Sequence, residues 1–115
     1  MGEFICDTVI EGALLTLRPT GYIDDFAGNQ LLSIVQRGFT QGVTKLLLNL
    51  SDSPVINSPG VSRLLEITEG IEERRGKMAI VGLSTVSERF FQMAGILDEA
   101  ETFSDEASAR ASLGV

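Results

Sequence analysis

The sequence predicts an α/β fold: a small single domain with a mixed, mostly parallel central sheet of about 4–5 strands packed against about four helices. Short apolar runs alternate along the chain with longer segments whose apolar residues recur at helical spacing, which is the order of strand–helix–strand units. The length of 115 residues fits one domain with one core. The sequence has no internal repeat, low-complexity tract or linker, so a single domain over residues 1–115 is expected.

A β-hairpin is predicted at the start of the chain. Residues 3–10 and 13–17 are rich in apolar and β-branched side chains, and the Glu-Gly step between them is a tight-turn signal. The proline and glycine within residues 19–21 are expected to end the second strand. Cys6, the only cysteine, is expected to be a small buried residue of the first strand.

The first helix is predicted over residues 25–40. Asp24 or Asp25 can cap its start, because a carboxylate accepts hydrogen bonds from the free N–H groups of a first turn. Gly42 suits the residue that follows a helix. The apolar residues that recur at helical spacing are expected to face the core; they are Phe26, Leu31, Leu32, Val35 and Phe39.

The next stretch predicts a buried strand over residues 45–50, a polar loop over 51–58 and an amphipathic helix over 59–74. Pro59 suits the first helical position, where its missing N–H is not needed. Ser58 then has two interpretations. It is either an unmodified N-cap, or a hydroxyl at the positive end of a helix that can be modified.

A further strand is predicted over residues 78–83, followed by a helix that Thr85 caps within the capping-box sequence TVSE. Phe91 is out of phase with the apolar face of this helix, so it is the aromatic residue to consider as an exposed contact. The chain ends with a short strand at 102–103 and a helix capped within residues 104–106. The expected core face of the helix after Thr85 comprises Val86, Phe90, Met93 and Ala94.

Charge excludes two classes of partner. Sixteen acidic and nine basic residues give a formal net charge of −7, which repels phosphate backbones and anionic lipid. We therefore expect no nucleic acid partner and no membrane insertion. Four glutamates between residues 66 and 73 are expected to be a solvated helix face, with an acidic docking surface as the alternative.

The composition also argues against catalysis. The chain has no histidine, which removes the usual general base and the commonest zinc ligand, and it has no phosphate-binding glycine loop. We expect a protein that is not an enzyme and that has no cofactor and no metal site. An unpaired cysteine and the lack of a signal peptide favour a cytoplasmic location.

Two short segments in this chain are Asn49-Leu50-Ser51, at the end of an apolar strand, and Ile56-Asn57-Ser58-Pro59-Gly60-Val61, before an amphipathic helix. In this order they resemble the signature of the STAS domain, the family of bacterial anti-sigma factor antagonists. Residues 21–24, 75–77 and 90–96 add weaker similarities, so the resemblance covers about residues 3–112. The chain departs from the family where Asn57 replaces an aspartate and Pro59 replaces a second serine.

The resemblance implies a switch. In such antagonists the unmodified domain binds an anti-sigma factor that is also a serine kinase. The kinase then phosphorylates the loop serine, which matches Ser58 here, and a serine phosphatase restores the domain. A monomer or weak homodimer is expected. The alternative is a phosphorylation-independent scaffold or subunit of a stress-signalling or transport assembly, which Asn57 and Pro59 favour.

The expected partner-binding surface is the loop before the second long helix together with the residues that flank it. Its polar members at 51–53 have a simpler alternative interpretation as a solvated loop. The candidate contact residues are Asp24, Ser51, Asp52, Ser53, Asn57, Ser58, Pro59, Gly60 and Arg63.

Overall fold

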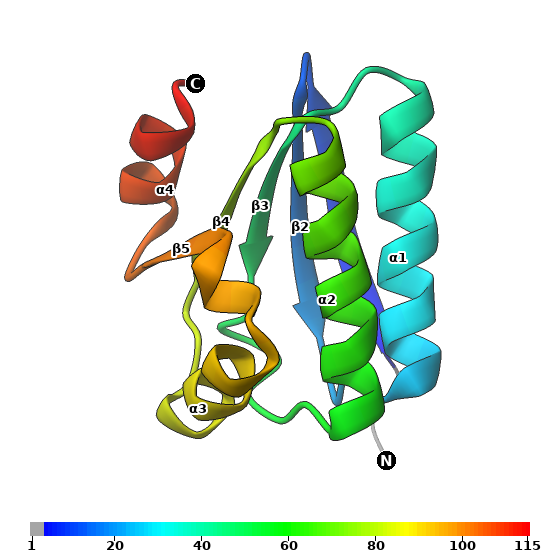
Figure 1. Ribbon diagram of the computed structural model, residues 1–115, viewed down its shortest axis with the longest axis vertical. Helices are drawn as coiled ribbons and strands as arrows, with labels where there is room; N and C mark the ends of the chain where they lie inside the picture. Colours follow the sequence, from blue (N-terminus) through cyan, green and yellow to red (C-terminus); the bar gives the residue numbers. More distant parts are fainter. Residues whose placement is uncertain (1–3) are drawn as a thin grey trace.

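A five-stranded sheet with helices on both of its faces forms the molecule (Figure 1). The computed structural model describes residues 4–115. The strands are β1 (Ile5–Glu11), β2 (Leu14–Thr20), β3 (Lys45–Asn49), β4 (Lys77–Val81) and β5 (Ala100–Phe103). The helices are α1 (Asp25–Thr40), α2 (Ser58–Glu73), α3 (Thr85–Ala94) and α4 (Glu106–Leu113), with one 3₁₀ turn at Ile96–Asp98.

The strands lie in the order β1-β2-β3-β4-β5. β1 pairs antiparallel with β2 through the predicted hairpin, and every following pair is parallel. Parallel neighbours need crossover connections, which α1, α2 and the segment containing α3 supply. The predicted fold class, a mixed and mostly parallel sheet with helices, is confirmed.

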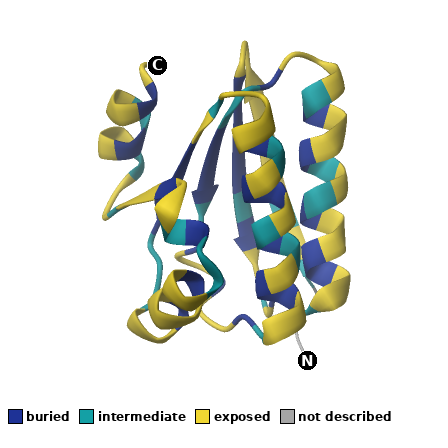
Figure 2. Ribbon diagram, viewed as in Figure 1, coloured by how far each residue is buried: buried dark blue, intermediate teal, exposed yellow. Residues whose placement is uncertain are grey.

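The main core fills the space between the sheet and the pair α1 and α2, which lie side by side over one face (Figure 1). Inward positions of the strands and the inner stripe of each helix are buried, whereas the outer sides of both helices are exposed (Figure 2). This pattern follows from strand alternation and helical periodicity. Fully buried members include Leu17, Leu31, Leu46, Leu64 and Ile67.

The opposite face of the sheet carries a smaller apolar cluster under α4 and a polar network beside it. Arg18 of β2 donates two hydrogen bonds to the Glu106 carboxylate at the start of α4, at 2.8 and 2.9 Å. Asn49 donates a third at 2.7 Å, and Arg18 also pairs with Asp7 at 2.8 Å. The hydrogen bond from Arg18 is the main cause that lowers the pKa of Glu106. Charge therefore helps to fix α4 on the sheet.

Two boundaries in the hairpin and the last strand differ from the prediction. β2 continues through Pro19 to Thr20, because β3 pairs with it only as far as Leu17, and a strand without a neighbour on one side tolerates proline. β5 begins at Ala100, two residues before the predicted strand. Cys6 is half-buried rather than buried, since it lies on the edge strand β1 and packs only against the rim of the main core.

The orientation predicted for α3 is wrong. Phe91 is fully buried, whereas Val86, Phe90 and Met93 are 67%, 46% and 84% exposed. The helix packs through Ser87 and Phe91, so the buried side is not the side with the most apolar residues. Phe26 of α1 also differs from its predicted place in the core, being 58% exposed.

Candidate partner-binding and phosphorylation site

The loop between β3 and α2 is hydrogen-bonded along its length to the segment that leads into α1. Gly21 N–H donates to the carbonyl of Asp52, and Ile23 N–H donates to the carbonyl of Val55, both at 3.1 Å. Asn57 N–H donates in return to the carbonyl of Ile23 at 3.1 Å. Because backbone bonds join two loops that are distant in sequence, the N-termini of α1 and α2 lie next to one another.

Two glycines allow this close approach. A Cβ atom on Gly60 of α2 would lie 2.3 Å from the backbone oxygen of Ile23. A Cβ atom on Gly28 of α1 would lie 2.7 Å from Cβ of Arg63. Both distances are shorter than real Cβ contacts, so any side chain at either position would push the two helix starts apart. Gly60 therefore acts by shaping the loop rather than by touching a partner.

Asn57, and not Ser58, caps α2. The Asn57 side-chain oxygen accepts the N–H of Gly60 at 2.9 Å, and its backbone is extended, as an N-cap requires. Ser58 is the first helical residue and Pro59 the second. The unmodified-cap interpretation of Ser58 is thus wrong by one residue. The asparagine performs the capping that the sequence assigned to the serine.

The Ser58 hydroxyl is exposed and forms no hydrogen bond with any described residue. Few N–H groups remain beside it to hold an anion. Pro59 has none, and the N–H groups of Gly60 and Val61 are bonded to Asn57. The start of α2 therefore presents a free hydroxyl and the partial positive charge of the helix, but not a ready-made anion cradle.

Charged residues around the start of α2 are mostly acidic. Asp24 caps α1, accepting the N–H of Ala27 at 2.9 Å. Arg63 is the nearest cation along α2, and it is already engaged with Asp25 at 2.9 Å and with Glu66. The hydrogen bond from Arg63 to Asp25 is the main cause that raises the pKa of this arginine. Arg63 is thus already paired and is not free to neutralise a new negative charge at Ser58.

The three polar residues at 51–53 do not share one environment. Ser51 and Asp52 are exposed, and the Ser51 N–H is fixed by the Asn49 side chain at 3.0 Å. Ser53 is only 1% exposed, and its hydroxyl has no hydrogen-bond partner among the described residues. The Ser53 side chain cannot reach a partner from this position, so we remove it from the contact surface.

Two features of the site were not predicted from the sequence. The hydroxyls of Ser84 and Ser87 both donate to the carbonyl of Pro54 at 3.2 Å, which joins the start of α3 to the loop. Ser84 is also the N-cap of α3, one residue before the predicted Thr85. The signal in the sequence was the presence of two serines three residues apart, Ser84 and Ser87, at the start of a predicted helix. The second feature is Val55, which is 59% exposed at the loop surface.

Neither a membrane segment nor a metal centre is found in the described residues. No helix within residues 4–115 is both long and apolar enough to cross a membrane. Over the same range, no cluster of three or more histidine, cysteine, aspartate or glutamate residues could hold a metal ion.

Comparison with known proteins gives one family and a consistent set of folds. The family model of the STAS domain matches residues 6–109. A putative anti-sigma factor antagonist from Thermotoga maritima has a TM-score of 0.84 at 18% identity, covering 96% of this chain and 95% of that one.

Two further solved structures share the fold. The Bacillus cell fate determinant SpoIIAA, in its phosphorylated form, has a TM-score of 0.75 at 19% identity, covering 96% and 99% of the two chains. A sulfate transporter family protein from Wolinella succinogenes has a TM-score of 0.72 at 19% identity, covering 91% and 89%. Because the family model matches most of the sequence, this chain belongs to the STAS domain family.

Proposed function

We propose that this domain is an anti-sigma factor antagonist-type regulatory protein that binds an anti-sigma factor serine kinase and is released when Ser58 is phosphorylated. The observation that carries the proposal is the free Ser58 hydroxyl at the first position of α2. Since Asn57 already caps the helix, a kinase can modify Ser58 without removing an interaction that holds the fold. The phosphorylated form of SpoIIAA, a relative in fold, supports a modifiable residue in this architecture.

The electrostatic surroundings explain how the modification acts. A phosphate adds nearly two negative charges and several acceptor oxygens. The helix dipole tolerates this charge at the start of α2, so the domain stays folded. Arg63 is engaged with Asp25 and Glu66 and does not neutralise the phosphate. The added charge therefore stays at the surface, where it is costly to desolvate against a partner.

The proposed contact surface surrounds Ser58. Its polar part comes from two loops and the first turns of α2, and Val55 adds an exposed apolar side chain at the same loop. The domain is a binding module in this proposal, and a serine phosphatase returns it to the binding state. The contact residues are Asp24, Ser51, Asp52, Val55, Asn57, Ser58, Pro59 and Arg63.

The direct test is partner affinity in matched variants. Tagged wild-type domain, Ser58→Ala and Ser58→Asp are used to capture proteins from an extract of the source cell, and the captured kinase is then purified for calorimetry. We expect Ser58→Ala to bind like wild type and Ser58→Asp to bind at least about tenfold more weakly, which corresponds to roughly 1.4 kcal/mol. Ser108→Asp, an exposed serine at the start of α4, controls for added charge. Equal binding by Ser58→Asp and wild type would contradict the proposed switch.

A second candidate function is a phosphorylation-independent subunit of a stress-signalling or transport assembly. The likeness to the Wolinella sulfate transporter family protein favours it, as do Asn57 and Pro59 in place of the family's aspartate and serine. In that case the capture experiment returns a membrane transporter or another STAS protein, and Ser58→Asp has no effect on its retention.

A further inference from the structure

β1 is an edge strand with an open side. Its one neighbour among residues 4–115 is β2. The strand reads ICDTVIE and contains neither proline nor lysine, but it carries two charged residues, Asp7 and Glu11. Prolines and charged side chains commonly prevent edge strands from pairing with another chain. Three of its apolar side chains are exposed: Ile5, Val9 and Ile10, at 60%, 37% and 41%. An edge strand with exposed apolar side chains is a site for pairing with a further strand where its charges are neutralised.

The acidic residues of β1 are neutralised within the domain. Asp7 pairs with Arg18 at 2.8 Å, and Glu11 pairs with Arg110 of α4 at 3.0 Å. These pairs matter because the chain as a whole carries a formal charge of −7, which opposes association of two copies. Each carboxylate of β1 thus has an arginine beside it, which reduces that opposition at this edge.

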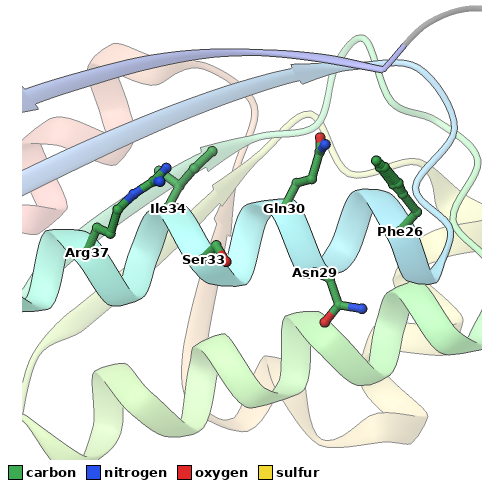
Figure 3. Close-up of a pocket in the computed structure, with 6 residues that line it drawn as sticks. All are labelled: Phe26, Asn29, Gln30, Ser33, Ile34 and Arg37. Carbon is green, nitrogen blue, oxygen red and sulfur yellow. The ribbon is translucent and has the colours of Figure 1, made fainter.

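A groove lies along α1 (Figure 3). Its volume is about 530 Å³, and it is lined by Phe26, Asn29, Gln30, Ser33, Ile34 and Arg37. Phe26, Gln30 and Ile34 extend from α1 toward the side of β1 and β2, while Asn29 points toward α2 (Figure 3). The lining contains one cation and no carboxylate, in contrast to the acidic composition of the chain. Phe26 gives the groove an exposed aromatic ring.

The strand and the groove lie on the same face of the sheet. Cys6, Thr8 and Ile10 pair in register with Pro19, Leu17 and Leu15, and both leucines belong to the core that α1 and α2 cover. Paired residues of neighbouring strands share a face. The alternate residues of β1 therefore point to the side on which α1 lies.

We propose that β1 and the α1 groove form a homodimer interface, in which β1 pairs antiparallel with β1 of a second copy. Overlap of all seven residues places Thr8 opposite Thr8 on the two-fold axis. Ile5 then faces Glu11, Cys6 faces Ile10 and Asp7 faces Val9, so no two carboxylates lie directly opposite. The resulting seam is roughly 24 Å long, at about 3.4 Å per residue.

The symmetry also places the helices. A two-fold axis perpendicular to the sheet keeps both α1 helices on the same face, so each groove faces the α1 helix of the other copy. Phe26 and Ile34 of both copies then cover the seam. The start of α2 lies on the side of α1 away from this edge (Figure 1), so the dimer leaves Ser58 outside the interface.

Charge exchange at Thr8 tests the interface. Sedimentation velocity over a concentration series is expected to show wild type approaching twice the monomer mass. Thr8→Lys alone and Thr8→Glu alone place like charges on the axis, and each is expected to weaken the dimer at least about tenfold. An equimolar mixture of the two variants places lysine opposite glutamate and is expected to restore the dimer. Phe26→Asp, at an exposed position of the groove, is expected to dissociate it as well.

Val86→Lys is the matched control, because Val86 is a similarly exposed apolar residue on α3. It is expected to leave the mass unchanged, and circular dichroism verifies that every variant is folded. A wild type that stays monomeric over the whole series overturns the proposal. So does a dimer that the Thr8 variants leave intact. Dissociation by Val86→Lys instead would assign the interface to α3.

Discussion

The helices α2 and α4 begin with the same type of capping hydrogen bond, but their first residues have opposite roles. Asn57 accepts the N–H of Gly60 at 2.9 Å, and Asp105 accepts the N–H of Ser108 at 2.7 Å. In both helices the cap thus bonds to the third helical residue. The first residue of α4, Glu106, is held by Arg18 and Asn49, whereas the first residue of α2, Ser58, has no hydrogen-bond partner for its hydroxyl among the described residues.

This difference separates a structural terminus from one that is available for regulation. At α4, removal of the first residue breaks a network that connects the helix to two strands. At α2, the cap and the packing of Gly60 hold the helix start, so the first residue is free to change its charge.

The largest expected effect is at Gly60. Gly60→Ala places a Cβ atom 2.3 Å from the Ile23 backbone oxygen, and we expect the free energy of unfolding to fall by about 2–3 kcal/mol. The control is Ser108→Ala, because Ser108 is the third residue of α4, as Gly60 is of α2, and it is exposed. Its effect on the free energy of unfolding is expected to stay within about 0.5 kcal/mol. Urea unfolding measures both. Equal effects would show that the start of α2 is not tightly packed.

The next effect is at Glu106. Glu106→Gln removes the charge that accepts two hydrogen bonds from Arg18. Since Arg18 is 40% exposed and Glu106 26%, solvent screening reduces the loss to about 1–2 kcal/mol of unfolding free energy. Glu69→Gln, on the exposed side of α2, serves as the control and is expected to change little. Comparable losses in both variants would contradict a stabilising role of the network around Glu106.

The same residue predicts a pH dependence. The folded pKa of Glu106 is lowered below its ordinary value of 4.5, chiefly by Arg18, so the unfolded state binds the proton more readily. The contribution of Glu106 to the free energy of unfolding is therefore complete above pH 4.5. It is lost as the pH falls through the folded pKa. We expect the stability difference between wild type and Glu106→Gln to shrink in acid. Unfolding series at neutral pH and at steps below 4.5 measure it, and a difference that persists unchanged would contradict the assignment.

Loss of either cap is expected to cost about 1 kcal/mol. Asn57→Ala and Asp105→Ala leave one N–H of the first turn without its side-chain acceptor, at α2 and α4 respectively. Asn57→Asp keeps an acceptor and is expected to retain the stability of wild type. Thermal unfolding of the three variants provides the comparison. If Asn57→Ala unfolds like wild type while Ser58→Ala is destabilised, the assignment of the cap to Asn57 is wrong.

The smallest expected effect is at Ser58 itself. Ser58→Ala removes a hydroxyl that bonds to no described residue, and we expect the unfolding free energy to change by less than about 0.5 kcal/mol. Ser84→Ala is the contrast, because the Ser84 hydroxyl caps α3 and donates to Pro54. Its expected cost is about 1 kcal/mol. The two variants are measured side by side by denaturant unfolding, and the reverse order would contradict the comparison.

The positions of the helices and strands were predicted from the sequence better than the sides on which they are buried. The alternation of short apolar runs with helical patterns gave the mixed sheet, and the predicted first helix at residues 25–40 agrees with α1. The apolar pattern of α3 was misleading because Val86, Phe90 and Met93 outnumber Phe91. Phe91 is buried because it packs into the main core, and Ser87 bonds to the carbonyl of Pro54. Periodicity cannot show such tertiary contacts.

The candidate site was predicted in part. Its location at the start of α2 follows from the local signals of a polar loop, a serine and a proline. The exchange of capping from Ser58 to Asn57 was not predicted, since either residue type can cap and only the backbone geometry decides. The burial of Ser53 was also missed, because the bonds between this loop and residues 21–23 connect segments that are distant in sequence.

The most direct test of the central claim is the phosphorylation state of the domain in its own cell. Tagged wild type and Ser58→Ala are purified from the source organism with phosphatase inhibitors, and intact mass and peptide mapping are measured. We expect a fraction of the wild type to carry one phosphate, located on Ser58, and Ser58→Ala to carry none. A wild type without phosphate under conditions in which partner binding changes, or a phosphate on another serine such as Ser51 or Ser62, would contradict it.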